Sequence, residues 1–286
     1  MNALTYAGTT RERSASDGLH RHEAGPADGV PLVLLHGSGP GVSGWSNFAA
    51  NLPVLAQRFR TIVVDLPGFG ASPDLAYDRP YPEVAAAAVV RLLDDLGIEK
   101  AHLLGNSMGG WVALEAAASA PDRIDRLVLM GPGGLYAPLH GPMVSEGALR
   151  LGEFLAEPTR AALEAWVRTM VADPATITPA LLDERWANAT APGAIERMRA
   201  VMASLALPGR APLWARTDEI PHPTLVTWGR DDRMLPPDGA LFALRRMPNA
   251  DLHVLGACGH WAQVERKHDF ESLVLDFLTR EEPPCS

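Results

Sequence analysis

The sequence predicts an α/β protein built on a doubly wound, mostly parallel sheet with an inserted helical lid. The first observation is a set of short, near-continuous apolar runs, each stopped by a segment rich in glycine or proline. Runs of this kind suit strands that are buried on both faces, as in a parallel sheet. The second observation is that helical patterns lie between these runs, which is typical of βαβ units. The third is a long interval without strand patterns, at about residues 135–217.

The first half of the chain contains four predicted strands, and each precedes a loop of turn-forming residues. Residues 1–30 are polar and weakly patterned, so we expect a loose start there with a strand or two. Two Ala- and Leu-rich segments, 83–96 and 109–119, predict helices that end near Gly or Pro. The four strands are expected at 31–35, 61–65, 101–105 and 126–130.

The second half begins with helices alone and then returns to the strand and helix alternation. The lid helices are expected at about 144–155, 159–171, 179–188 and 193–205, with prolines between most of them. The later elements are expected as strands at 222–228 and 251–255 and as helices at 239–246 and 267–279. We therefore expect one domain, whose core spans 1–134 and 218–286 and whose lid spans 135–217.

Composition and charge exclude several classes of protein. The 286 residues carry 25 Lys and Arg against 34 Asp and Glu, a net charge of −9. This balance argues against a nucleic-acid binder and against adsorption to an anionic membrane. No window reaches about 18 uninterrupted apolar residues, and the N-terminal residues lack the apolar core of a signal peptide, so we expect a cytoplasmic protein. The spacing of the two cysteines, Cys258 and Cys285, matches no thiol motif.

The segment Gly105-Asn106-Ser107-Met108-Gly109 matches the pattern G-x-S-x-G. It follows a predicted strand and precedes a predicted helix, which is the context that a nucleophile elbow requires. Such a turn strains the serine backbone and lifts its hydroxyl above the sheet. It also directs the Met108 N–H toward a developing oxyanion. The alternative is an ordinary serine in a glycine-rich turn.

A serine hydroxyl needs a base, and the base needs an acid that fixes its tautomer. His260 follows the last predicted strand, and the pair Asp231 and Asp232 follows the strand before it. The order serine, aspartate, histidine is the order of α/β-hydrolases. All these residues fall at the carboxyl ends of predicted strands, where open α/β sheets place their sites. Either aspartate can instead be a solvated or helix-capping carboxylate.

A second glycine-rich loop, His36-Gly37-Ser38-Gly39, follows the first long apolar run. Glycines allow the backbone to approach a substrate oxygen closely, so we assign the second oxyanion donor to the backbone N–H of Ser38. A plain tight turn is the alternative. The loop does not favour a dinucleotide site, because it lacks the G-x-G-x-x-G spacing.

Together these segments resemble the α/β-hydrolases that cleave carbon–carbon bonds in the meta-cleavage products of aromatic-ring degradation. The resemblance covers about residues 30–279 and rests on LLHGSGPGVSGWSNF, GNSMGGWVALEAA, LVLMGPGGL, TWGRDDR and CGHWAQVE. It implies a catalytic triad of Ser107, Asp232 and His260, with Asp232 preferred over Asp231. It also implies Ser38 and Met108 as oxyanion donors.

The resemblance further implies that Asn47, Asn106 and Trp261 line the site and that a lid arginine binds the dienoate end of the substrate. Arg185 is the best match for that arginine, with Arg197, Arg199 and Arg210 as competitors. Alternatively, Arg185 is a surface arginine and Trp261 is a tryptophan that serves only in packing. Asn47 and Asn106 can likewise be amides that stabilise their loops. The implied partner is a small dienoate, with no nucleic acid or membrane, and the implied assembly is a homodimer or larger.

The implied reaction is hydrolysis of a 2-hydroxy-6-oxo-hexa-2,4-dienoate to 2-hydroxypenta-2,4-dienoate and a carboxylic acid. We expect no metal or organic cofactor, because the histidines outside the proposed triad, such as His36, His102, His222 and His253, lack ligand spacing. The segment Gly131–Leu139 and the lid suggest an apolar pocket for the C6 substituent. Two other functions stay open: a serine esterase or lactonase with the same triad, and a hydrolase-fold binding module without turnover.

Overall fold

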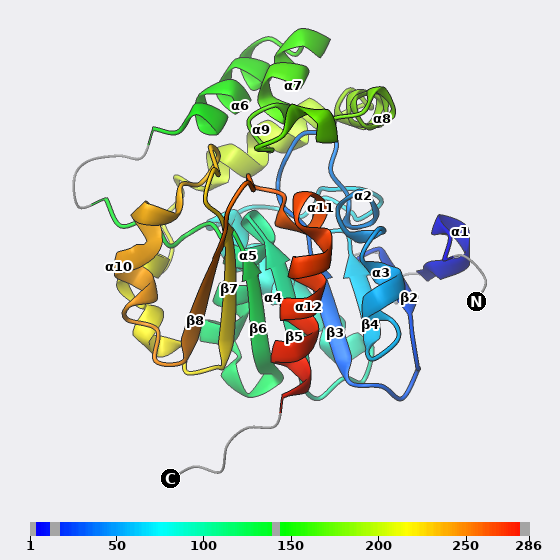
Figure 1. The fold of residues 1–286 in the computed structure, drawn as a ribbon, viewed down its shortest axis with the longest axis vertical. Helices are drawn as coiled ribbons and strands as arrows, with labels where there is room; N and C mark the ends of the chain where they lie inside the picture. Colours follow the sequence, from blue (N-terminus) through cyan, green and yellow to red (C-terminus); the bar gives the residue numbers. More distant parts are fainter. Residues whose placement is uncertain (1–3, 12–17, 139–143, 281–286) are drawn as a thin grey trace.

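One eight-stranded sheet forms the centre of the protein (Figure 1). The computed structural model describes residues 4–11, 18–138 and 144–280. The strand order is β1-β2-β4-β3-β5-β6-β7-β8. Strands β1 and β2 pair antiparallel, as do β2 and β4, and all other neighbours are parallel. The strands are β1 Thr10–Arg11, β2 Arg21–Ala24, β3 Pro31–Leu35, β4 Arg60–Val64, β5 Ala101–Asn106, β6 Ile124–Met130, β7 Thr224–Gly229 and β8 Ala250–Leu255.

The central strands are buried on both faces, as their apolar runs predict. In β3 the side chains of Val33 and Leu35 enter one hydrophobic cluster, and those of Leu32 and Leu34 enter the other. Since successive strand residues point to opposite faces, a continuous apolar run is needed to fill both layers. The predicted parallel α/β sheet is therefore confirmed.

Helices cover both faces of this sheet (Figure 1). The cluster around Val33 includes residues of α4 and α5, and the cluster around Leu32 includes residues of α2, α3 and α12. The helices outside the lid are α1 Tyr6–Thr9, α2 Gly44–Phe48, α3 Leu52–Leu55, α4 Tyr81–Asp95, α5 Met108–Ser119, α10 Leu241–Leu244, α11 Ala262–Glu265 and α12 Lys267–Thr279.

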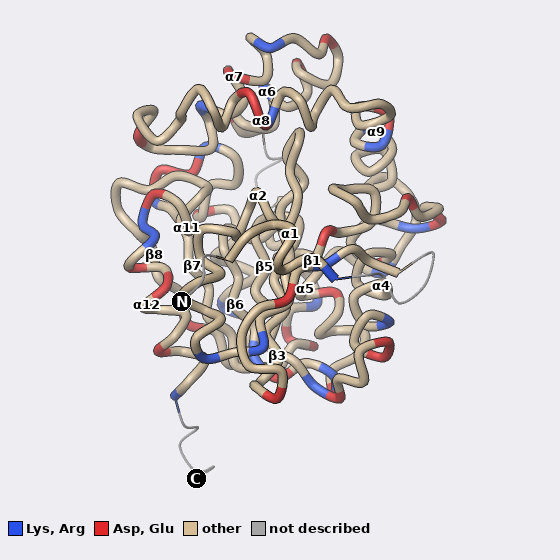
Figure 2. Tube along the Cα trace, turned by 90° about the vertical axis from the view of Figure 1, so that its right-hand side faces the viewer, with Lys and Arg blue, Asp and Glu red and all other residues tan. Residues whose placement is uncertain are grey.

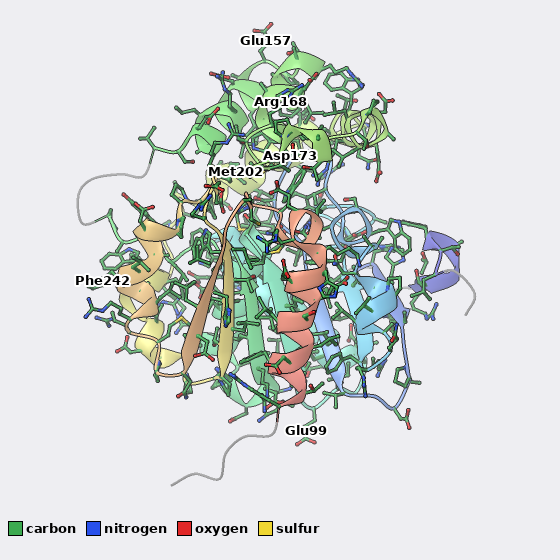
Figure 3. The ribbon with its side chains drawn as sticks, viewed as in Figure 1. Glu99, Glu157, Arg168, Asp173, Met202 and Phe242 are labelled. Atoms are coloured by element: carbon green, nitrogen blue, oxygen red, sulfur yellow. The ribbon has the colours of Figure 1, made fainter. Side chains whose placement is uncertain are left out.

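Four helices inserted between β6 and β7 form a lid above the carboxyl ends of the strands (Figure 1). They are α6 Glu146–Ala156, α7 Arg160–Val167, α8 Pro179–Ala189 and α9 Ala194–Ser204. Figure 3 shows Met202 of α9 where the lid meets the core, and Glu99 at the opposite end of the molecule. The lid has its own cluster, which includes Phe154 and Trp166 and closes on Trp261 of the core. The four predicted lid helices are present, and the bounds 135–217 of the lid as a unit stay a prediction.

Predicted and observed elements differ where segments are short or a tertiary contact ends a helix. Helices α2, α3 and α11 span four or five residues each, too few for a helical period to show. The predicted helix 239–246 is α10, preceded by the 3₁₀ turn Pro237–Ala240. Helix α7 stops at Val167, ahead of the predicted 171, because the chain turns there and the Met170 carbonyl accepts from the His260 N–H at 2.8 Å.

Charge is spread over the surface. In the view of Figure 2, Lys and Arg lie among Asp and Glu around the periphery, with no single-sign stripe. Within the described ranges, no helix is long and apolar enough to cross a membrane. Cys258 is a buried free thiol whose pKa is raised by burial to about 12, and Cys285 lies outside the described residues.

Helix α5 packs against β3 so closely that glycine is required at the contact. A Cβ at position 109 would lie 2.1 Å from the Leu35 carbonyl oxygen, and one at position 105 would lie 2.4 Å from the Gly109 carbonyl oxygen. Both obstacles are backbone atoms, which cannot rotate away as a side chain can. The strand–turn–helix unit around Ser107 therefore depends on Gly105 and Gly109.

We expect Gly109→Ala to lower the free energy of unfolding by at least about 2–3 kcal/mol, because α5 must move away from β3. Denaturant unfolding measures this loss. Gly152→Ala is the matched control, since nothing lies within 4 Å of its Cβ position on α6. That control should be neutral or stabilising by up to about 1 kcal/mol. Equal stability of the two variants would contradict the close approach.

Candidate active site

Ser107 has a strained backbone at the tip of the turn between β5 and α5. Its φ of 54° and ψ of −114° lie outside the regions that a residue with a side chain normally adopts. Three hydrogen bonds hold this geometry. The Ser107 N–H donates to the Met130 carbonyl at 2.9 Å, and the Ser107 carbonyl accepts from Gly133 at 2.9 Å and Trp111 at 3.1 Å.

His260 and Asp232 are brought together from two neighbouring loops. The His260 Nδ1 lies 2.7 Å from Asp232 Oδ2, and both side chains are buried. The second oxygen, Asp232 Oδ1, accepts from the backbone N–H groups of Met234 and Leu235 at 2.8 Å. Asp231 instead pairs with Arg230 on the surface. Of the two adjacent aspartates, only Asp232 bonds His260.

The lid holds the loop that carries His260. The Met170 carbonyl at the end of α7 accepts from the N–H of His260, and Glu265 Oε2 accepts from Gly259 N–H at 2.7 Å. Glu265 Oε1 also accepts from Ala172 N–H of the lid at 2.7 Å. One carboxylate thus ties the lid to the histidine loop, a link that the sequence did not reveal.

Gly131 makes room for the His260–Asp232 pair, a role that no sequence pattern indicates. Its φ is +48°, and a Cβ there would lie 3.1 Å from His260 Nδ1 and 3.3 Å from Asp232 Oδ2.

His36 anchors the loop that carries Ser38. Its Nε2 accepts from the Leu66 N–H at 2.9 Å, so Nδ1 carries the proton and donates to the Gly37 carbonyl at 2.6 Å. Burial lowers the pKa of His36, which keeps the ring neutral and preserves this tautomer. Within the described ranges, no cluster of three or more His, Cys, Asp or Glu side chains is arranged to hold a metal ion.

A narrow cavity of about 20 Å³ brings most of the predicted site residues together. Asp232 lies behind His260, and Met108 lines a second cavity next to the first. The narrow cavity also contacts Trp166 and Met170 of the lid segment, which the sequence pattern did not single out. The predicted residues that line it are Ser38, Asn47, Asn106, Ser107, Arg185, His260 and Trp261.

Arg185 reaches this narrow cavity from helix α8 of the lid. Its guanidinium donates to the Pro40 carbonyl at 3.2 Å and lies 5.0 Å from the centre of the Trp261 ring. Burial lowers the pKa of Arg185 to about 10, so the side chain stays cationic at neutral pH. The side chain is 6% exposed and pairs with no carboxylate in the described ranges, which leaves its charge available to an anion.

The three competing arginines make other contacts. Arg197 lies 3.7 Å from Asp74, Arg199 donates to the Leu155 carbonyl, and Arg210 pairs with Glu219. None of the three lines the narrow cavity.

The amides Asn47 and Asn106 differ in their partners. The Asn106 side chain donates to the Met130 carbonyl at 3.2 Å, so it stabilises the turn as well as lining the cavity. The Oδ1 of Asn47 is buried without a hydrogen-bond partner.

The second cavity, about 330 Å³, is also lined by Ser107. Aromatic and aliphatic side chains dominate it, and no described residue that lines it is charged. Residues from the core, the Gly131–Leu139 segment and the lid all contribute, and Leu139 itself lies outside the described residues. The aromatic members are Trp111, Tyr136, Trp214 and Trp228.

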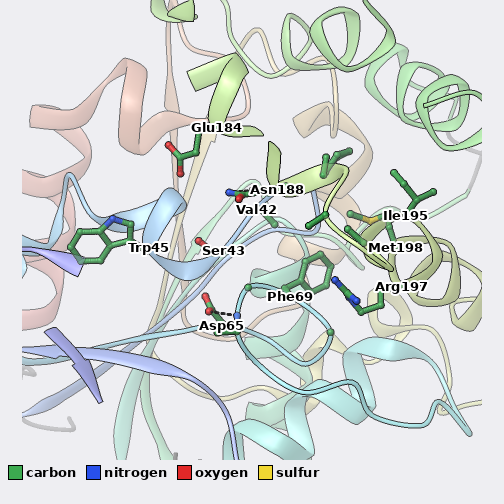
Figure 4. A pocket seen from close by; sticks show the side chains of 18 of the residues that line it. Val42, Ser43, Trp45, Asp65, Phe69, Glu184, Asn188, Ile195, Arg197 and Met198 are labelled. Atoms are coloured by element: carbon green, nitrogen blue, oxygen red, sulfur yellow. Dashed lines mark hydrogen bonds between the residues drawn. The ribbon is translucent and has the colours of Figure 1, made fainter. Parts of the chain in front are cut away.

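A third hollow of about 490 Å³ lies between the outer side of the core and helices α8 and α9 (Figure 4). Val42 lines both this hollow and the narrow cavity, so its turn separates the two. Figure 4 shows Arg197 beside Phe69 in this hollow, which Ser107 does not line.

The strained serine turn, the buried His–Asp pair and the lid define a class of protein. Residues 30–267 match the α/β hydrolase fold family, and the chain belongs to it.

Comparison with individual proteins narrows the class to the meta-cleavage product hydrolases, to which the chain belongs. A 2-hydroxy-6-oxo-6-phenylhexa-2,4-dienoate hydrolase from Burkholderia cepacia is 43% identical over 267 residues, 91% of each chain. A 2-hydroxy-6-oxononadienedioate/2-hydroxy-6-oxononatrienedioate hydrolase from Comamonas testosteroni is 42% identical over 267 residues, again 91% of each. The structure of a 2-hydroxy-6-oxo-6-phenylhexa-2,4-dienoate hydrolase from Rhodococcus has a TM-score of 0.84 at 31% identity and covers 95% of this chain and 98% of that chain.

We expect stability to fall as the pH drops below about 6.5, the ordinary histidine pKa of the unfolded chain. Burial lowers the pKa of His36, His22 and His102 in the folded state, so the unfolded chain takes up protons first. Above the histidine pKa of the unfolded chain, these histidines cost the folded state no stability. The free energy of unfolding then falls as the pH drops toward the lower histidine pKa values of the folded state. Denaturant midpoints between about pH 8 and about pH 5 measure it. His36→Gln should weaken the dependence, and the exposed His253→Gln should not; a midpoint that rises on acidification would contradict the account.

Proposed function

We propose that this protein hydrolyses the C5–C6 bond of 2-hydroxy-6-oxo-hexa-2,4-dienoates that carry an apolar group at C6. The observation that carries the proposal is the placement of Ser107 between two unlike cavities. One holds a buried cation, and the other is apolar. A substrate with a carboxylate at one end and an apolar group beyond its ketone matches the chemical character of both linings.

Arg185 and Trp261 are proposed to hold the carboxylate and the 2-oxo group. A buried guanidinium binds a carboxylate more strongly than an exposed one does, because solvent does not screen the contact. The free Oδ1 of Asn47 is available to accept from the 2-hydroxyl of the dienol. The polar end of the substrate thus meets a cation that pairs with no described carboxylate, although it donates to the Pro40 carbonyl, and an acceptor that has no described hydrogen-bond partner.

The lining of the second cavity favours an aryl or alkyl substituent at C6. The names of the two kinds of relative differ in the substrate that they give. The substrate in one name carries a phenyl group at C6, and the substrate in the other ends in a second carboxylate. A carboxylate in the apolar cavity would lose its hydration without a described cation in return. We therefore favour the phenyl type of substrate over the dioate.

The proposed chemistry begins with ketonisation, in which the dienol proton passes to C5. Ser107 Oγ then bonds to C6 and its proton passes to His260, whose charged form Asp232 stabilises. The C5–C6 bond breaks, its electron pair passes through the C3–C4 double bond to the 2-oxo group, and His260 returns the proton to the resulting dienolate. Water cleaves the remaining ester and releases the carboxylic acid.

The oxyanion at C6 is proposed to lie between the N–H groups of Ser38 and Met108. Met108 is the first residue of α5, where backbone N–H groups point outward and the helix dipole favours negative charge. The loss of one such donor typically costs about 10²–10³ in rate.

The coloured 2-hydroxy-6-oxo-6-phenyl dienoate tests this function. We expect the purified protein to remove its absorbance and release benzoate. Ser107→Ala should lose nearly all turnover and still bind the dienoate. Brisk hydrolysis of an aryl ester with no decay of the dienoate would contradict the proposal and favour the esterase or lactonase alternative. Binding without any turnover would favour the binding module.

The variant Arg185→Gln further distinguishes cleavage of the dienoate from hydrolysis of an ester. We expect it to lower kcat/KM for the dienoate by about 10²-fold or more, because the loss of a charge-assisted contact that is strongest in the transition state lowers the rate. Hydrolysis of a neutral aryl ester should change far less. Arg199→Gln, on an exposed face of the lid, is the matched control. Equal losses for both substrates would indicate a structural arginine.

We also propose that the protein is a cytoplasmic homodimer or larger assembly and that residues 135–217 act as one lid unit. The family supports the assembly, and the run of four helices between β6 and β7 supports the lid. Light scattering of the purified protein tests the assembly.

A further inference from the structure

Trp111 forms part of the wall of the apolar cavity, one helical turn after Ser107 on α5. Glycines pack against its indole: a Cβ at position 134 would lie 2.9 Å from Trp111 Cδ1 and 2.9 Å from Leu213 Cδ2. A Cβ at position 133 would lie 3.3 Å from the same indole. The ring therefore occupies a slot that any side chain at position 134 would obstruct.

The Trp111 indole N–H donates to Glu115 Oε1 at 3.2 Å, one turn further along α5. Glu115 is 4% exposed, and its two carboxylate oxygens lie 2.6 and 2.5 Å from Arg216 Nη2. Arg216 is also buried, and its Nε donates to the Ala211 carbonyl at 2.8 Å. A chain of hydrogen bonds thus runs from the Trp111 indole through Glu115 to Arg216.

This chain connects two walls of the apolar cavity. Trp111 belongs to α5, whereas Arg216 belongs to the segment that returns from the lid to β7. The same segment supplies Pro212, Leu213 and Trp214 to the lining. The Glu115–Arg216 pair therefore fixes the position of the indole relative to the facing wall.

A contribution to the stability of the fold does not by itself explain the buried Glu115–Arg216 pair. Replacing a buried ion pair by apolar residues of similar volume is often neutral or stabilising, because each charge loses its hydration. The pair is better explained by its effect on the position of Trp111, because the Trp111 indole in the cavity wall donates to Glu115. A tryptophan has two side-chain torsions, and one hydrogen bond at its nitrogen restricts both.

We propose that Trp111 determines which C6 substituents the enzyme accepts and that Glu115 and Arg216 are positioning residues for its ring. This inference rests on the proposed function and concerns only selectivity among dienoates. The readout is the ratio of kcat/KM for a naphthyl and a phenyl group at C6. That ratio does not depend on the fraction of active enzyme.

Trp111→Ala should raise the naphthyl-to-phenyl ratio by about 10-fold or more, the range that pocket size commonly controls. The shortened side chain opens the cavity to the larger group and removes contact from the smaller one. An unchanged ratio would overturn the role of Trp111.

Glu115→Gln tests the positioning. The glutamine keeps an oxygen for the indole N–H but loses the charge that holds Arg216. We expect the ratio to rise by about 3-fold or more in the natural background and to stay constant in the Trp111→Ala background. An equal rise in both backgrounds would show that Glu115 acts independently of Trp111. Arg216→Lys, which keeps the charge and changes the two-oxygen contact, replaces Glu115→Gln if the latter does not fold.

Glu164→Gln is the matched control. It makes the same chemical change in an exposed pair with Arg168 on the lid, where N and O lie 2.7 Å apart. This variant should keep the natural ratio. A failure of the proposed function has a different result: the natural enzyme then cleaves neither dienoate. Turnover of both dienoates with a ratio that no variant alters contradicts the selectivity inference alone.

Discussion

The close packing of α5 against β3 is the constraint on which the site depends. It leaves no space for a Cβ at Gly109, and Gly105 faces the backbone of the same helix. The turn between strand and helix is consequently tight, and Ser107 takes a positive φ. Backbone strain of this kind persists only where the surroundings over-determine the geometry. Here the hydrogen bonds to Met130, Gly133 and Trp111 supply that support.

The lid completes the site by holding the remaining groups in place. It supplies Arg185 from α8, and the Met170 carbonyl holds the N–H of His260. Glu265 links the same loop to the lid through backbone N–H groups on both sides. A change in the lid therefore affects both the cation and the histidine. The two cavities share Ser38, Ser107, Leu151 and Met234. Arg185 lines only the narrow cavity and Trp111 only the apolar one, so affinity for the dienoate and selectivity at C6 can vary separately.

The sequence predicts the parallel sheet and the lid helices well, because doubly buried strands leave short apolar runs and amphipathic helices leave a clear period. It also brings Ser107, His260 and an aspartate to one edge, since each follows a predicted strand. The residue pattern alone does not separate Asp231 from Asp232, because adjacent loop residues differ only in side-chain direction, and the preference for Asp232 comes from the family resemblance. Glu115 and Arg216 escape notice for a related reason: they are 101 residues apart, and only the fold brings them into contact.

In the proposed mechanism, Ser107 carries the acyl half of the substrate after the carbon–carbon bond breaks. Rapid quenching during turnover of the phenyl dienoate, followed by mass spectrometry of the peptides, detects this acyl group. We expect a benzoyl group on Ser107, absent after quenching a His260→Ala variant. A fully active enzyme with no acyl group on that peptide, or with the group on Ser38, would contradict it.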